Sequence, residues 1–95
     1  MNYKEDIVWV AMSDKTRRDI LSLLEKKDMS AGEIAKHFSI SKPSISHHLN
    51  IMKQAGFINA EKSGQNIIYS FSPNFGDEIL AFIDRFQTKK STKRA

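Results

Sequence analysis

The sequence predicts a mainly α-helical domain that carries one small β-hairpin. Apolar residues recur at helical spacing through most of residues 3–54, and short alternating runs follow at residues 57–72. A second helical stripe comes after these runs. A chain of 95 residues is the size of one domain. We expect about five helices and a two-stranded hairpin, with the domain over residues 1–87 and a basic, disordered tail over residues 88–95.

Two helices are expected at the start of the chain. The first covers residues 3–12, and Asp14 is well placed to cap the second. Arg17 and Arg18 follow this cap, and two roles remain open for them, namely a phosphate contact or an ion pair that braces the domain. The residues of the second helix that we assign to the core are Ile20, Leu21, Leu23 and Leu24.

Residues 30–57 predict two further helices joined by a tight turn. Ser30 and Glu33 have the spacing of a capping box at the start of the first of these helices. Ser39 and Ile40 form the expected turn, with Ile40 plugging the core. The stripe that this helix buries consists of Ile34, Ala35 and Phe38.

The second helix of this pair has clear boundaries. Ser41 is its expected N-cap, and Pro43 is tolerated because a helix has no use for an N–H in its first turn. Gly56 occupies the C′ position, where a left-handed backbone commonly ends a helix. The core face of this helix consists of Ile45, Leu49 and Met52.

The opposite face of the same helix is polar and contains no acidic residue. Ser44 and Ser46 flank it near the N-terminal end. Side chains of this kind hydrogen-bond to base edges or phosphates when the early turns of a helix enter a DNA major groove. The alternative is an ordinary helical hairpin with a solvated face. The side chains opposite the core are Pro43, His47, Asn50 and Gln54.

A hairpin follows directly, with strands expected at residues 57–63 and 66–72 and its tip at Gly64-Gln65. Alternation places Ile67, Tyr69 and Phe71 on one face, where Ile58 and Ala60 pair with them. A helix-turn-helix with such a hairpin makes a winged helix. The alternative is a hairpin that only closes the core. The side chains expected to touch phosphate or sugar are Lys62, Gln65 and Asn66.

Four segments together resemble the ArsR family of bacterial winged-helix repressors, and within it the branch of small autorepressors typified by the repressor of the sporulation-delaying operon. They are residues 12–21, 40–49, 53–58 and 64–71, and their order and spacing agree with the family. The resemblance implies a homodimeric repressor that binds an inverted repeat in double-stranded DNA near its own promoter. The DNA-reading residues that it implies are Lys42, Pro43, Ser44, Ser46, His47 and Asn50.

Metal sensing at the family's familiar sites is not expected. Residues 27–33 contain no cysteine, and no histidine follows Tyr69, although Asp77, Glu78 and Asp84 are present. We therefore expect no metal and no cofactor. A metal-responsive repressor with an atypical His/Asp site at a dimer interface stays open as an alternative.

The terminal helices are more apolar than a compact winged helix requires. Together with Trp9, they predict the surface of a symmetric homodimer, as the resemblance also implies. The alternative is a last helix that folds back on its own core. The expected dimer residues are Ile7, Trp9, Ile79, Phe82, Ile83 and Phe86.

Charge is polarised along the chain. The net charge is +4, of which residues 85–95 contribute +5, so the remainder carries −1. Residues 36–64, which include the predicted DNA face, carry +3, whereas residues 65–84 carry −3. This local charge suits phosphate binding better than the overall balance does.

Other functions find less support. No arrangement typical of an enzyme emerges, and the chain has neither a bilayer-spanning run nor a signal-peptide pattern. The absence of cysteine fits a cytoplasmic protein. A winged-helix module that binds protein is the alternative from another class, but acidic or bulky apolar residues would then be expected at residues 42–50. An inducer or partner protein remains possible but unidentified.

Overall fold

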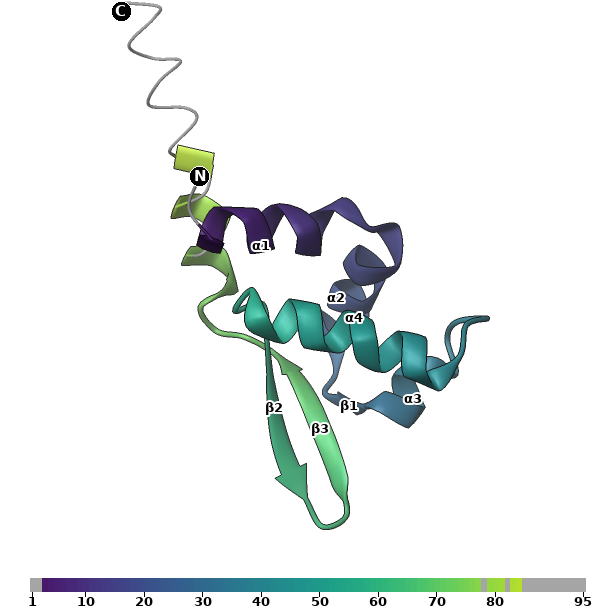
Figure 1. Ribbon diagram of the computed structural model, residues 1–95. Coiled ribbons are helices and arrows are strands. Elements are labelled where there is room, and N and C mark those ends of the chain that lie inside the picture. Colours follow the sequence, from purple (N-terminus) through teal and green to yellow (C-terminus); the bar gives the residue numbers. More distant parts are fainter. Residues whose placement is uncertain (1–2, 78, 82, 85–95) are drawn as a thin grey trace, which may run out of the picture.

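The computed structural model describes residues 3–77, 79–81 and 83–84, with the side chains of residues 3–5 left aside (Figure 1). Helices form one layer, and a β-hairpin projects from it. The expected mainly helical fold with a wing is confirmed. The helices are α1 (Tyr3–Ser13), α2 (Lys15–Lys26), α3 (Ala31–Ala35) and α4 (Lys42–Gln54), and the strands are β1 (Met29–Ser30), β2 (Ile58–Ser63) and β3 (Asn66–Phe71). Helical residues also occur at 75–77, 79–81 and 83–84.

The helix boundaries follow the capping residues. Asp14 accepts a hydrogen bond from the Arg17 N–H at the start of α2. Ser30 and Glu33 form the expected capping box of α3. The Glu33 N–H donates to the Ser30 side chain, and the Ser30 N–H donates to the Glu33 side chain. Gly56 ends α4 with a φ of 83°, a left-handed conformation that is far less strained for glycine than for other residues.

The sheet has three antiparallel strands in the order β1-β3-β2, one more than expected. The hairpin has the predicted register, since Ile58 pairs with Phe71 and Ala60 with Tyr69. Gly64 stands at the first position of the two-residue tip with a φ of 63°, as a type II′ turn requires. The added strand β1 pairs with the other side of β3, so that the hairpin is tied to the segment between α2 and α3.

One core connects the helical layer to the base of the hairpin. Its apolar side chains come from α1, α2, α3, α4 and β2, and from Phe57 between α4 and β2, which has no exposed surface. Phe75 packs edge-on against Phe57 and Phe71, at 4.9 and 4.8 Å between ring centroids. The largest fully buried side chains are Phe57, Ile20, Leu24, Ile34, Ile45, Leu49, Met52 and Ile58.

The prediction for Ile40 is wrong. Its side chain is 39% exposed in the turn before α4, and it does not plug the core. The helix α3 ends at Ala35, sooner than its apolar stripe suggested, and Phe38 packs against the core from the turn that follows. Because Phe38 and Ile34 fill this side of the core, the turn can leave Ile40 outside.

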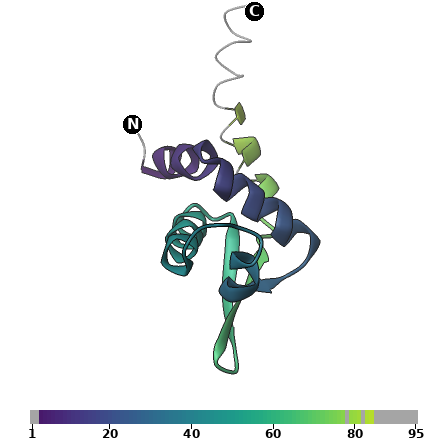
Figure 2. The same cartoon turned by 90° about the vertical axis from the view of Figure 1, so that its right-hand side faces the viewer.

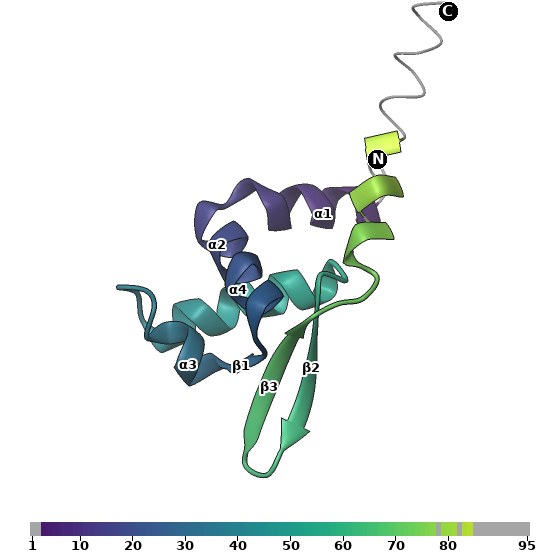
Figure 3. The same cartoon turned by 180° about the vertical axis from the view of Figure 1, so that it is seen from behind.

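The two ends of the molecule differ. The tip of the hairpin lies at one end, whereas α1 and the helical residues after the hairpin lie at the other (Figures 2 and 3). Within the described residues, no helix is both long and apolar enough to cross a membrane. The expected tail at residues 88–95, as well as Phe82 and Phe86, lies outside the described residues.

Candidate nucleic-acid interface

The helix α4 is held by its apolar face and leaves its polar face outward. Ile45, Leu49 and Met52 are at most 1% exposed, and they anchor the helix as predicted. The residues implied for DNA reading lie away from this stripe, on the N-terminal part of α4. All of them are exposed, namely Lys42, Pro43, Ser44, Ser46, His47 and Asn50.

Side chains, and not the backbone of the helix terminus, are the groups that the N-terminal part of α4 leaves available for hydrogen bonding. Pro43 has no N–H, the Ser44 N–H donates to Ser41 Oγ at 3.2 Å, and the Ile45 N–H donates to the Ser41 carbonyl at 3.1 Å. The backbone N–H groups of this first turn are therefore largely unavailable to donate hydrogen bonds to a phosphate. The Ser41 hydroxyl also donates to Ser44 Oγ at 3.0 Å, which leaves the Ser44 proton available to a base or phosphate acceptor.

A hollow between α3 and α4 adds a lysine that the sequence did not single out. The residues that line this hollow are Ser30, Gly32, Glu33, Ala35, Lys36 and Lys42. The Lys42 Cε and Nζ atoms lie 3.9 and 4.0 Å from the position that a Cβ on Gly32 would take. Lys36 thus shares a surface with Lys42, although the two lysines are six positions apart in the sequence. Its contribution to local charge was visible in the sequence, but its place beside α4 depends on how α3 packs.

The wing presents its polar residues at the far end of the hairpin. Lys62, Gln65 and Asn66 are all exposed near the tip. Ile67, which pairs with Lys62, is 47% exposed, so that the tip is not part of the core. The hairpin closes the core with the half nearer its base, where Ile58 is buried and Tyr69 and Phe71 pack against the core cluster.

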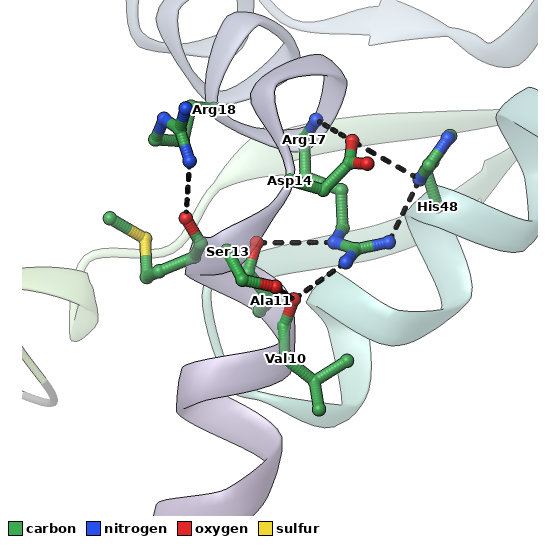
Figure 4. A network of polar contacts seen from close by, with 8 residues as sticks. Val10, Ala11, Ser13, Asp14, Arg17, Arg18 and His48 are labelled. Carbon is green, nitrogen blue, oxygen red and sulfur yellow. Dashed lines mark hydrogen bonds and ion pairs between the residues drawn. The ribbon is translucent and has the colours of Figure 1, made fainter.

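Arg17 lies between the end of α1 and His48 of α4 (Figure 4), and it does not belong to the exposed polar face of α4. Its side chain is 7% exposed, and its Nε and Nη2 donate to the carbonyls of Ala11 and Val10 at 3.1 and 2.6 Å. Its Nη1 lies 3.0 Å from His48 Nδ1 on α4. Of the two roles left open by the sequence, the structural one applies, although the partners are carbonyls and an imidazole and not a paired acid.

The Arg17 contact fixes the state of His48. A guanidinium only donates hydrogen bonds, so His48 Nδ1 must accept and the imidazole is neutral with its proton on Nε2. Burial lowers the pKa of His48, and the charges of Arg17 and His47 lower it further, against an opposing effect of Asp14. Asp14 Oδ2 is 3.9 Å from His48 Nδ1.

Asp14 stays ionised beside this network. Burial alone would raise the pKa of its carboxyl group, but hydrogen bonds from the backbone N–H groups of Arg17 and Thr16 and the charge of Arg17 outweigh that effect and lower it. Metal ligands are not gathered anywhere comparable, since the part of the chain that the structure describes contains no cluster of three or more His, Cys, Asp or Glu.

The predicted dimer residues fall into two groups. Trp9 and Ile83 are 53% and 41% exposed, and Leu80 is exposed beside them in sequence at 65%. Ile7 and Ile79, by contrast, are half-buried and pack against the core of their own chain. The last helix therefore packs in part on the core of its own chain, through Ile79, which agrees with the alternative to a dimer surface. It also exposes an apolar outer side, through Leu80 and Ile83.

Comparison with known proteins agrees with this geometry. Residues 14–60 match the model of the arsR family of bacterial regulatory proteins. The chain is 62% identical to the transcriptional repressor SdpR of Bacillus subtilis over 82 residues, which cover 86% of this chain and 91% of SdpR. It is 31% identical over 87 residues to the HTH-type transcriptional regulator Rv2034 of Mycobacterium tuberculosis, covering 92% and 81% of the two chains.

Solved structures repeat the fold. An ArsR-like transcriptional regulator from Rhodococcus sp. RHA1 superposes with a TM-score of 0.77 at 27% identity, covering 96% of this chain and 83% of its own. A homodimeric winged helix-turn-helix DNA-binding domain from Mycobacterium bovis has a TM-score of 0.70 at 19% identity, with 97% and 84% covered, and supports the fold alone. The chain therefore belongs to the ArsR family of bacterial regulatory proteins, as a winged-helix DNA-binding regulator of transcription and not an enzyme.

Proposed function

We propose that two copies of this chain bind an inverted-repeat operator and repress transcription, including that of their own gene. The observation that carries the proposal is the outer face of α4, where six exposed residues without a single acid lie on a helix that its core face holds in place. The 62% identity to a transcriptional repressor supports the direction of regulation.

The side chains divide by reach. Ser44, Ser46, His47 and Asn50 on α4 are suited to base edges, and an asparagine makes a two-bond contact with adenine. Such contacts specify sequence, whereas phosphate contacts position the protein on the duplex. The residues that we assign to phosphate or sugar are Lys42 on α4 and Lys62, Gln65 and Asn66 on the wing, and Pro43 packs against the backbone beside them.

Dimerisation is proposed through the outer side of the terminal helices. Trp9, Leu80 and Ile83 expose apolar surface there, and Phe82 and Phe86 continue the sequence stripe, while Ile7 and Ile79 support it from the core side. A two-fold axis through this surface would place two recognition helices about 34–36 Å apart, one turn of DNA. The Mycobacterium bovis domain, which has the same fold, is described as homodimeric.

A repressor of this kind acts in the cytoplasm, where bacterial DNA lies. Its DNA contacts require no cofactor and no metal. An inducer or a partner protein is the proposed agent of release from the operator, and autoregulation without either is the alternative.

The proposal is tested by binding purified protein to the DNA upstream of its own gene at two salt concentrations, with scrambled DNA of equal length as the control. Footprint-sized protection of an inverted repeat that survives the higher salt is expected. Equal binding to both DNAs that salt abolishes would mean nonspecific attraction by the basic residues at 85–95. The protein-interaction alternative would then become the better account.

A further inference from the structure

A buried arginine needs partners for its donors, and Arg17 finds them on two other helices. Moving a charged group out of water is costly unless hydrogen bonds replace the lost hydration. Arg17 is 7% exposed and contacts Val10, Ala11 and His48. These contacts connect α2, which carries Arg17, to α1 and to α4 (Figure 4).

The contacts with α1 complete the end of that helix. The last four carbonyls of a helix have no partner within it, and the helix dipole makes that end negative. In α1 these are the carbonyls of residues 10–13, and the last turn of α1 contains no basic residue. Arg17 binds the carbonyls of Val10 and Ala11, and Arg18 binds that of Met12 at 2.7 Å. The cationic cap of α1 is thus supplied by α2.

The remaining contact of Arg17 reaches the recognition helix. His48 is 16% exposed and points inward, whereas its neighbour His47 is exposed on the face assigned to DNA. The same guanidinium therefore contacts the end of α1 and the middle of α4. Because α1 also carries the exposed Trp9 and Val10, this contact lies between the proposed dimer surface and the proposed reading face.

We propose that Arg17 and His48 are positioning residues for DNA recognition, which fix α4 relative to the end of α1 through a contact that holds only while His48 is neutral. The proposal rests on the proposed function, since it concerns how the dimer presents its reading faces. Neither residue is required to touch DNA.

The contact has a defined pH dependence. Protonated His48 would lose the Nδ1 lone pair and would place a second cation 3.0 Å from Arg17. The charged groups that act on His48 are Asp14 and Arg17, at the start of α2, and His47 on α4, and α1 contributes carbonyls to the network. Since the pKa of His48 is lowered in the folded protein from 6.5, the contact is present above about pH 6.5 and is lost as acid protonates the ring.

The experiment measures operator affinity from pH 7.5 to 5.0 for the full chain and three variants. His48→Asn places an amide oxygen near the position of Nδ1 and does not titrate, and His48→Leu removes the acceptor. His37→Asn is the matched control, because His37 is exposed in the turn after α3. The readouts are the operator affinity, the preference over scrambled DNA and the thermal midpoint at each pH.

We expect His48→Asn to bind as the wild type does at pH 7.5, within about twofold, and to show a weaker loss on acidification. His48→Leu should lose about tenfold in operator affinity at pH 7.5, as the loss of a hydrogen bond to a charged group implies. His37→Asn should follow the wild-type profile. Because His47 is present in the wild type and in both His48 variants, differences between their profiles report on the change at position 48.

Two outcomes would overturn the proposal. One is an acid profile of His48→Asn that coincides with that of the wild type, and the other is full operator affinity in a folded His48→Leu. If His48→Leu does not fold, the profile of His48→Asn still decides. Failure of the proposed function would look different, because the wild type itself would then show no preference for the operator at pH 7.5.

Discussion

The outer face of α4 and the outer side of the terminal helices are both exposed, yet their chemistry is opposite. The α4 face consists of serine, histidine, asparagine, lysine and proline, whereas α1 exposes Trp9 and Val10, and the last helix exposes Leu80 and Ile83. Small polar groups suit a charged and hydrated partner, and apolar groups suit a partner that excludes water. A domain this small therefore separates a polar surface, which we assign to nucleic acid, from an apolar surface, which we assign to a protein partner.

The separation is also spatial. The wing tip and the terminal helices lie at opposite ends of the molecule (Figure 1), and the Arg17 contacts join α1 to α4 through the interior. Changes on one surface should consequently affect one kind of binding first. The following predictions, from the largest expected effect to the smallest, test whether the two surfaces are as distinct as their composition indicates.

The largest effect is expected for a carboxylate on the reading face. Ser44→Glu and His47→Glu should each lower operator affinity by about 100-fold, because each dimer gains two anions facing phosphates. Electrophoretic mobility shift and solution mass measure DNA binding and dimer state separately. Ser22→Glu on the exposed side of α2 adds the same charge elsewhere and should have little effect. Unchanged affinity in both reading-face variants would exclude this face.

A carboxylate on the apolar side should instead act on assembly. Leu80→Glu places a charge on a side chain that is 65% exposed in the single chain, so the fold should tolerate it while the dimer weakens. Sedimentation should show a shift toward monomer, and operator affinity should fall by about tenfold because the two half-sites are no longer bound together. A half-site duplex is the control, and its affinity should hardly change. A dimer of unaltered strength would contradict the assignment.

Loss of the α4 cap should have a moderate effect on stability. Ser41→Ala removes the acceptor for the Ser44 N–H and should cost about 1 kcal/mol of unfolding free energy. Thermal denaturation at fixed protein concentration would detect a decrease of about 4–8 °C for a domain of this size. Ser46→Ala, on the same helix but without a cap role, should not lower the midpoint, because alanine favours a helix more than serine does, and it should reduce only DNA binding. Equal midpoints for the two variants would argue against the cap.

The smallest effect is expected on the wing. Lys62→Ala should weaken binding to operator and scrambled DNA by the same factor and should lower the slope of affinity against salt by about one per wing. Lys15→Ala is a suitable control, because Lys15 pairs with Asp19 on α2 at 2.8 Å. A loss confined to the operator would instead mean that the wing reads sequence.

Features set by nearby residues could be predicted from the sequence. The caps at Asp14, Ser30 and Ser41 depend on hydrogen bonds between residues that are three positions apart in the sequence. All three caps form as expected. The hairpin register follows from a two-residue turn and from alternation. The apolar stripe of α4 likewise appears in the sequence as a simple period.

Features set by residues that are distant in the sequence could not be predicted in this way. The strand β1 is two residues long and exists because β3 offers it unpaired backbone groups, so its own sequence contains little strand signal. Arg17 and His48 are 31 residues apart, and which of the two neighbouring arginines turns inward depends on where α1 ends. Ile40 lies outside because Phe38 and Ile34 already fill the adjacent core.

The strand order β1-β3-β2 leaves one long side of β2 without a neighbouring strand among the described residues. Such a free edge invites a strand from another molecule, and the result is aggregation. Here Glu61 and Lys62 put opposite charges on that strand, and Asn59 is exposed near its start. The wing can therefore project into solvent without joining a second wing edge to edge.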